Sequence, residues 1–144
     1  MHVLLPVDAD VEDAVAATNT VAELPCAAAE IQVTILNVHE DIDVKSDEGP
    51  TVRSEEWYDE EDFPESAARA EAVLEEAGIT TEKRRKLAEP APGIVEAADE
   101  LGADRIVMCG RKRSPVGKVL LGSVTQSVLL NTDVPVTVTD AARR

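Results

Sequence analysis

The chain has 144 residues, two cysteines, one residue each of Trp, Tyr and Phe, and a formal net charge of −15. This length is typical of one domain with its own core, and no apolar run reaches the roughly 18 residues that a membrane span needs. The negative charge argues against a general nucleic-acid binder, because nucleic-acid phosphates are attracted to positive surfaces. Cys26 and Cys109 are far apart in the sequence and have no metal-ligand spacing. With no basic segment before the first apolar run, we expect a cytoplasmic protein with reduced thiols.

Apolar runs alternate with helical patterns along the chain. The run 3–7 is typical of a buried parallel strand, and the pattern over 11–24 indicates a helix that Pro25 ends. A second strand is expected at 31–38, followed by an acidic insertion at about 40–64 that holds all three aromatic residues. The elements predicted after it are a helix at 65–77, an edge strand at 79–87, a helix from Pro92-Gly93 to Gly102, a strand at 105–109, a helix at 123–131 and a strand at 134–139.

This alternation predicts one α/β domain over residues 1–144, with a doubly wound five-stranded parallel sheet and helices on both faces. In such a sheet a ligand crevice forms at the carboxyl ends of the strands, where the strand order reverses. The pattern alone permits more than one doubly wound strand order. For the helix at 65–77 it predicts an apolar face formed by Ala68, Ala72, Val73 and Leu74.

The segment 104–138 contains an apolar run, a basic loop from Gly110 to Lys118, a helix start at Gly122-Ser123 and a second apolar run. It resembles the C-terminal segment of the universal stress protein family, small α/β domains of which some bind ATP through a Gly-x-x-Gly-x9-Gly-Ser/Thr signature. The resemblance covers nearly the whole chain apart from the acidic insertion. It implies the strand order 3-2-1-4-5, a crevice shared by Asp8 and the loop after strand four, and a homodimer that pairs through strand five.

The glycine signature is only partly present. Aligned on Gly122-Ser123, its first two glycines fall on Cys109 and Lys112, and Gly110 lies one place late. Glycines in such loops let the backbone approach a phosphate and adopt positive φ, which residues with a Cβ atom resist. We therefore expect ATP to bind weakly or not at all, whereas AMP or a simple phosphate at Gly122-Ser123 is compatible with the sequence.

Candidate ligand contacts follow the first two strands. Asp8, at the end of strand one, could accept hydrogen bonds from a ribose or an adenine edge, and Pro6-Val-Asp8 matches the nucleotide-binding relatives. It could equally interact with the dipole of the following helix. The resemblance implies that Val38 lies against the base, although on sequence alone it is a core valine.

Further candidates lie in the loop and at the last helix. Ser123 and Val124 open a helix after Gly122, where N–H groups can meet an anion, but Ser123 could also be a simple N-cap. Positive charge gathers just before them, and these side chains could contact phosphate or pair with nearby acids. The cations are Arg111, Lys112, Arg113 and Lys118. A second basic run, 83–86, is interpreted as an edge-strand guard or an interface element.

No Ser-His-Asp order, paired metal ligands or intact P-loop can be assembled from this sequence. This absence favours a non-enzymatic protein, and the family resemblance implies a stress-response domain of nucleotide-binding type. The alternatives are an interaction module with an empty crevice and a slow metal-dependent ATPase that uses Asp8. The dispersed acidic surface, with few lysines, also favours a halophilic origin. The predicted site residues are Asp8, Val38, Gly110, Arg111, Gly122, Ser123 and Val124.

Overall fold

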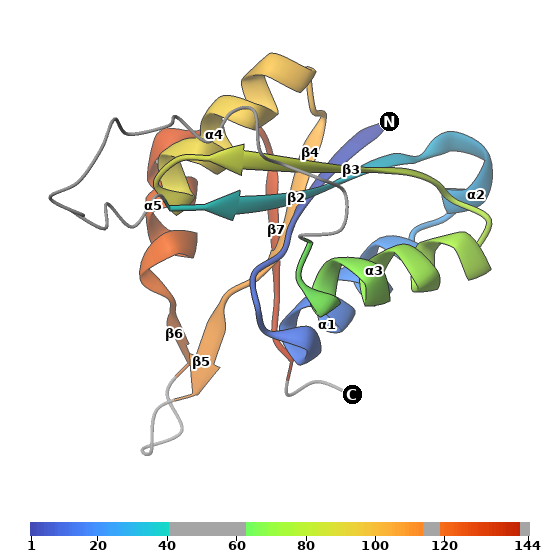
Figure 1. Ribbon diagram of the computed structural model, residues 1–144, viewed down its shortest axis with the longest axis horizontal. Coiled ribbons are helices and arrows are strands. Elements are labelled where there is room, and N and C mark those ends of the chain that lie inside the picture. The colour runs from blue at the N-terminus through green and yellow to red at the C-terminus, as the bar shows by residue number, and fades with distance from the viewer. Residues whose placement is uncertain (41–62, 114–118, 142–144) are drawn as a thin grey trace, which may run out of the picture.

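The computed structural model describes residues 1–40, 63–113 and 119–141. A parallel five-stranded sheet runs through the centre in the order β3-β2-β1-β4-β7 (Figure 1). This confirms the predicted fold class and strand order, with β7 as the expected strand five. The strands are β1 (His2–Pro6), β2 (Gln32–His39), β3 (Thr80–Leu87), β4 (Arg105–Cys109) and β7 (Val136–Thr139). Most of the acidic insertion, residues 41–62, lies outside the described residues.

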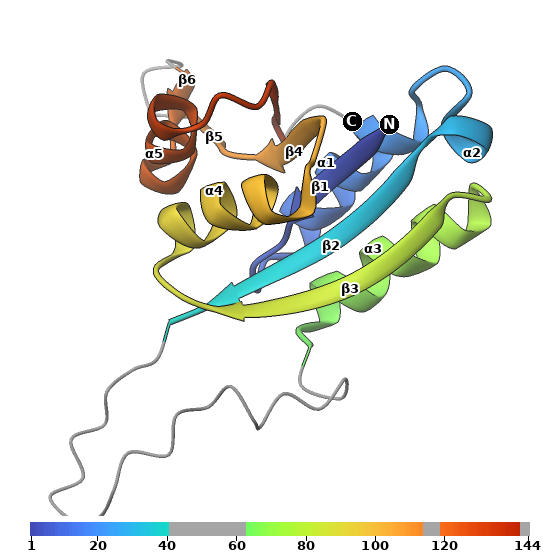
Figure 2. The ribbon, with the colours of Figure 1, turned by 90° about the horizontal axis from the view of Figure 1, so that it is seen from above.

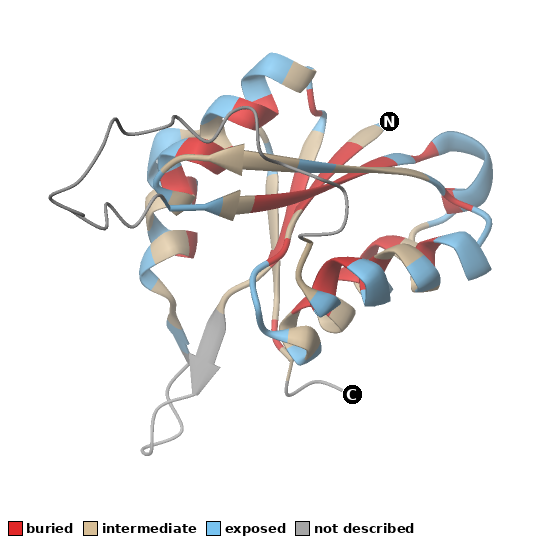
Figure 3. Ribbon diagram, viewed as in Figure 1, coloured by how far each residue is buried: buried red, intermediate tan, exposed pale blue. Residues whose placement is uncertain are grey.

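Helices cover both faces of the sheet (Figure 2). One face carries α1 (Val11–Ala22) and α3 (Glu65–Glu76), and the other carries α4 (Pro90–Leu101) and α5 (Ser123–Asn131). Neighbouring strand residues serve opposite faces, because side chains alternate along a strand. Leu5 thus belongs to the core beside α1 and α3, whereas Leu4 belongs to the core beside α4 and α5. Buried residues accordingly run along β1 and β2 and the inner sides of the helices (Figure 3).

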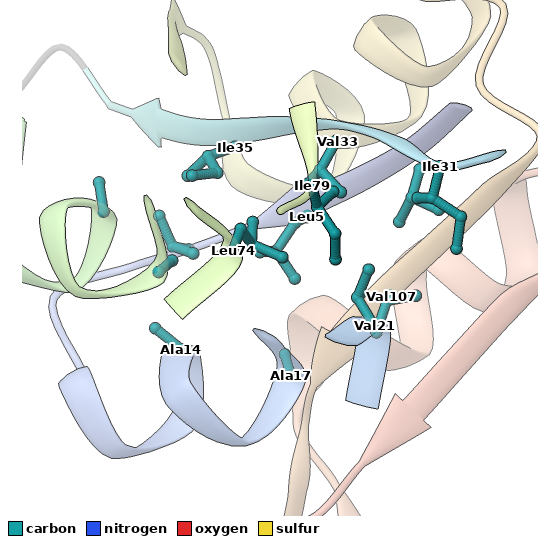
Figure 4. Packing of buried hydrophobic residues seen from close by; sticks show 14 of the residues in the cluster. Leu5, Ala14, Ala17, Val21, Ile31, Val33, Ile35, Leu74, Ile79 and Val107 are labelled. Atoms are coloured by element: carbon teal, nitrogen blue, oxygen red, sulfur yellow. The ribbon is translucent and has the colours of Figure 1, made fainter. Parts of the chain in front are cut away.

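The core beside α1 shows why this layer is stable (Figure 4). Ala14, Ala17 and Val21 of α1 face Leu5 and Val107 of the sheet, and all five residues are buried. Full burial of a valine or leucine side chain contributes about 1.5–3 kcal/mol. The small alanines let α1 lie close to the strands, which brings its first turn to the carboxyl edge of the sheet.

The predicted apolar face of α3 is wrong. Ala68 and Ala72 are exposed, and the residues that α3 buries are Ser66, Ala67, Ala70 and Leu74. Alanine is compatible with more than one side of a helix, so an alanine-rich pattern does not define a face. The helix is oriented by a polar contact instead, because the Ser66 hydroxyl donates to the backbone carbonyl of Asp8.

The basic run 83–86 lies on the edge strand β3, as predicted. Lys83 Nζ lies 2.8 Å from Glu71 of α3, and Lys86 Nζ lies 3.2 Å from both Glu96 and Glu100 of α4. Lys83 therefore pairs with an acid on one face of the sheet, and Lys86 pairs with acids on the other face. These ion pairs account for Lys83 and Lys86 within the domain, without a ligand or a partner.

Two features were not predicted. A short helix, α2 (Ala27–Glu30), precedes β2, and β5 (Arg111–Arg113) pairs with β6 (Val119–Leu121) as an antiparallel hairpin. The hairpin occupies part of the segment predicted as a basic loop, and strands of three residues are too short to show an alternating pattern. In Figure 1 its backbone extends beyond α5, at the lower left. Helix α4 begins at Pro90, earlier than predicted, because proline is well tolerated in a first turn.

Candidate ligand site at the carboxyl edge of the sheet

A cavity of about 180 Å³ opens at the carboxyl ends of β1, β2 and β4. It is lined by residues that end or follow these strands and by the first turns of α1, α4 and α5. Its position is the one expected for a ligand crevice in a doubly wound sheet. An apolar cavity of about 150 Å³ can hold benzene, so this one is large enough for a flat ring system. The lining residues are Pro6, Val7, Asp8, Asp13, Ala14, Leu36, Val38, Pro90, Ile94, Met108, Cys109, Val124 and Thr125.

One end of the cavity is apolar and rests on close packing between β2 and α4. Val38 and Ile94 line this end, together with Leu36 and Met108. A Cβ atom at Gly93 would lie 2.8 Å from Val38 Cγ1 and 2.9 Å from the Ala88 side chain. Glycine at this position therefore lets the first turn of α4 approach β2. That approach places Ile94 and Val38 at the same cavity.

Asp8 lies at the mouth of the cavity, held by the turn between β1 and α1. Its Oδ1 accepts a hydrogen bond of 2.8 Å from the backbone N–H of Asp10. Asp10 is the N-cap of α1, since its side chain accepts from the backbone N–H of Asp13 at 3.1 Å. Asn37 Nδ2 donates to the carbonyl of Val7 at 3.1 Å. Asp10 thus caps α1, and Asp8 presents an exposed carboxylate beside the cavity and near the N-terminus of this helix.

Cys109 and Asp13 meet on the opposite side of the cavity. Burial raises the pKa of the Cys109 thiol to about 12, and a hydrogen bond to Asp13 and the negative charges of Asp13 and Asp140 add to this effect. The thiol is therefore neutral at neutral pH and is a poor nucleophile. Sequence reasoning missed Asp13 because α1 and β4 are distant in the chain. Their contact follows only from the strand order.

Gly110 has a packing role. A Cβ atom there would lie 1.8 Å from Thr125 Oγ1, so only glycine permits α5 to approach the end of β4 this closely. The N–H of Gly110 donates to the carbonyl of Thr139 at 3.3 Å, and the N–H of Gly122 donates to the carbonyl of Gly110 at 2.7 Å. Both glycine amides are therefore used in holding β4, β7 and α5 together.

The strain expected at Cys109 and Lys112 does not occur. Among the described residues, positive φ is found only at Cys26, Gly78 and Gly102. Cys109 ends β4, and Lys112 lies in β5 opposite Leu120. Residues 111–113 and 119–121 pair as extended strands, so the backbone at Cys109 and Lys112 does not adopt positive φ.

The N-terminus of α5 completes the cavity. Gly122 is the N-cap and Ser123 the first helical residue, so the alternative of Ser123 as the N-cap is wrong. Val124 and Thr125 line the cavity. Thr125 is only 2% exposed, and its side chain fills the space beside Gly110.

The structure brings some of the predicted site residues together and separates others. Asp8, Val38 and Val124 line the cavity. Gly110 and Gly122 lie next to lining residues in the chain and are joined by a backbone hydrogen bond, whereas Ser123 is exposed. The side chain of Arg111 lies outside the described part of the structure. Their roles toward a ligand stay predictions.

Metal-ligand groups and membrane-spanning helices are both absent from the described residues. No group of three or more His, Cys, Asp or Glu side chains could hold a metal ion within residues 1–40, 63–113 and 119–141. In the same ranges, no helix is long and apolar enough to cross a membrane.

The chain is similar in sequence and in fold to known proteins. A universal stress protein of Mycolicibacterium smegmatis is 40% identical over 67 residues, which is 46% of this chain and 52% of that protein. The match thus spans about half the length of this curated relative. A universal stress protein from Archaeoglobus fulgidus has the same fold, with a TM-score of 0.72 and 26% identity over 97% of this chain and 98% of that one.

Other solved structures with this fold hold nucleotides. A universal stress protein from Archaeoglobus fulgidus in complex with dAMP has a TM-score of 0.65 and 22% identity, over 97% of this chain and 98% of that one. Similar structures contain cAMP and, in an Arabidopsis thaliana protein, AMP. The model of the universal stress protein family matches residues 1–140. The chain belongs to the universal stress protein family.

Proposed function

We propose that this protein is a stress-response regulatory domain that binds an adenine compound of the nucleotide class at the carboxyl edge of its sheet, without turnover. Family membership supports the general role, and the dAMP, cAMP and AMP complexes of similar proteins support the ligand class. The observation that carries the proposal is the cavity of about 180 Å³, which combines an apolar end with the polar side chains of Asp8 and Thr125.

The apolar end fits the base of such a ligand. Val38 and Ile94 offer aliphatic surface to a flat ring, and burying apolar surface stabilises a complex by roughly 25 cal/mol per Å². A ligand group that forms a hydrogen bond with the Thr125 hydroxyl would stabilise the complex by about 0.5–1.5 kcal/mol. The Asp8 carboxylate at the mouth is an acceptor suited to ribose hydroxyl groups.

The absence of turnover is proposed from the groups that face the cavity. The Cys109 thiol, with its pKa raised to about 12, is neutral and unsuited to nucleophilic attack. Among the described residues that line the cavity there is no histidine, lysine or arginine that could act as a general base or stabilise a transferring phosphoryl group.

The test is calorimetric titration with adenosine, AMP and ATP against a variant that fills the cavity. Val124→Phe adds a ring at the lining, and we expect it to weaken every adenine compound at least about tenfold by excluding the base. Val95→Phe is the matched control, since Val95 is also half-buried but lines a separate groove between α4 and α5. Its affinities should stay within about twofold of those of the wild type.

Other results would favour the alternative functions. If no adenine compound binds at millimolar concentration and protein from its host lacks adenine absorbance at 260 nm, the domain is an interaction module with an empty crevice. Metal-dependent release of phosphate from ATP, abolished by Asp8→Asn, would identify a slow ATPase. Binding with all ligand recovered unchanged supports the proposed role.

We also propose that the protein is a homodimer through β7. This strand is an edge of the five-stranded sheet, and an edge presents backbone groups that a second copy can pair in a two-fold arrangement. Light scattering at micromolar concentration tests this, and a monomer in both dilute and molar KCl would exclude the dimer. The halophilic origin also stays a prediction, which a higher melting temperature in molar KCl would support.

A further inference from the structure

We propose that the site selects an uncharged nucleoside over its phosphate esters, and that Asp8 and Asp13 determine this preference. The inference rests on the proposed function, because it assumes that the base of an adenine compound enters the cavity. It goes further by naming the class of ligand within that group: adenosine-type compounds should bind best, and each added phosphate should weaken binding.

The first observation is the charge of the cavity lining. Asp8 and Asp13 are its charged members, and no cationic side chain lines it within the described part of the chain. Cys109 cannot reverse this balance, because its thiol donates toward Asp13 and stays neutral. A phosphate on a ligand in this small cavity would therefore lie near two carboxylates. Like charges that lie close together repel each other, and the repulsion is stronger where water is partly excluded.

The second observation concerns the helix N-termini at the cavity, which could offset that repulsion. Helix α1 begins at the carboxylate cap of Asp10, and α4 begins after Glu89 with Pro90, which has no N–H to donate. Only α5 begins without an acidic residue at its cap or in its first turn. A helix N-terminus is equivalent to about +0.5 charge, which is smaller than the two negative charges of the lining.

The third observation concerns the backbone donors that would cradle a phosphate. The N–H groups of Gly110 and Gly122 already donate to the carbonyls of Thr139 and Gly110. A phosphate at this point would have to displace bonds that hold β4, β7 and α5 together. It would also meet the carbonyl oxygen of Gly110, which lies 2.7 Å from the N–H nitrogen of Gly122.

The remaining polar groups suit hydroxyl groups and a heterocycle. The Asp8 carboxylate accepts hydrogen bonds, and the Thr125 hydroxyl can both donate and accept. A nucleoside offers ribose hydroxyls and ring nitrogens for these groups and brings no charge. The hairpin β5–β6 carries Arg111, Lys112 and Arg113, and its backbone extends beyond α5 (Figure 1). The proposal requires that these cations do not outweigh the lining carboxylates.

The experiment compares adenosine, AMP and ATP by calorimetry with the full chain, in 0.15 M and 2 M KCl as chosen conditions (roughly 8 Å and under 3 Å of screening length). We expect adenosine to bind at least about tenfold more tightly than AMP at the lower salt. The ratio should shrink in 2 M KCl, because salt screens charge repulsion but not steric exclusion. Asp13→Asn should narrow the ratio at low salt by several fold, whereas the matched control Asp99→Asn, on the exposed far half of α4, should leave it unchanged.

Each outcome decides between the two proposals. If AMP binds as tightly as adenosine or more tightly, the nucleoside preference is wrong while the adenine-binding function stands. If none of the three compounds binds, the proposed function itself fails. If Asp13→Asn unfolds, the salt dependence of the wild-type ratio still decides, because a ratio independent of KCl concentration would overturn the electrostatic explanation.

Discussion

The two ends of the cavity are built in different ways. At the apolar end, Gly93 lets α4 pack against β2, and the surfaces of Val38 and Ile94 are left facing the cavity. At the other end, Gly110 lets α5 pack against β4, but here the glycine amides are used in bonds within the protein. At both ends a glycine permits close packing of a helix against a strand. This packing leaves apolar side chains facing the cavity at one end, whereas at the other end the backbone N–H groups are hydrogen-bonded within the protein. A glycine beside a ligand cavity can therefore be required by packing alone.

The largest effect on stability should come from a substitution that disturbs the packing of α5 against β4. Gly110→Ala should lower the free energy of unfolding by about 3 kcal/mol, because its Cβ would lie 1.8 Å from Thr125 Oγ1. Gly122→Ala is the matched control: φ there is −63°, and the nearest contact of a new Cβ is an ordinary 3.6 Å. Its stability should change by less than about 1 kcal/mol.

Urea unfolding of both variants checks this contrast. The double variant Gly110→Ala/Thr125→Ala should recover part of the loss, since it removes Thr125 Oγ1 and Cγ2 but keeps Thr125 Cβ, which would lie 2.7 Å from the new Cβ. Equal destabilisation by the two glycine substitutions would show that packing against Thr125 is not what requires Gly110.

A second difference should appear in thiol chemistry. At pH 8, iodoacetamide should modify Cys109 at least about tenfold more slowly than the exposed Cys26, because the pKa of Cys109 is raised to about 12 and little thiolate forms. Mass spectrometry of the two cysteine peptides measures both rates in one sample. Similar rates would show that burial and Asp13 do not protect the thiol.

The same thiol should affect stability at high pH. Its folded pKa of about 12 lies above the ordinary value of 9.0, so its bound proton favours the folded state. That contribution is complete below pH 9 and is lost as the pH rises toward 12. Wild-type protein should therefore lose more stability than Cys109→Ala between pH 9 and 11 in urea unfolding. A constant difference between the two proteins across this range would contradict the shift.

The smallest effect is expected at Thr125, which lies where the two ends meet. Thr125→Val keeps the shape of this buried side chain and removes its hydroxyl, so the free energy of unfolding should change by no more than about 1.5 kcal/mol. Adenosine affinity should fall roughly three- to tenfold, the usual value of one hydrogen bond. Thr80→Val, on the exposed start of β3, is the control for calorimetry. Unchanged affinity in Thr125→Val would remove the hydroxyl from the site.

The sequence was sufficient for the five strands of the main sheet, but not for the short strands β5 and β6. The short apolar run of β4 and the β-branched run of β2 have few alternatives, and the place of Asp8 follows from where β1 ends, whereas Val38 was singled out through the family resemblance. The strand order came from the family resemblance, because the alternation of elements permits several orders. The face of α3 was not predictable, since alanine fits more than one side of a helix.

The end of the cavity beside Gly110 was predicted less well, for a physical reason. Whether Gly110 serves a ligand or a neighbouring helix depends on which side chain fills the space beside it, and that side chain is Thr125. The pairing of Cys109 with Asp13 likewise depends on α1 crossing β4, which no local pattern shows. Hydrogen bonds between segments that are distant in the chain decide this end of the cavity.

The most direct measurement is a crystal structure of the protein grown with saturating adenosine. We expect the base in the cavity against Val38 and Ile94, a ribose hydroxyl within hydrogen-bond distance of Asp8, and the bond between Gly122 and Gly110 intact. If the cavity is empty in crystals grown with saturating adenosine, or if adenosine is bound at another surface, the assignment of this cavity as the ligand site is contradicted.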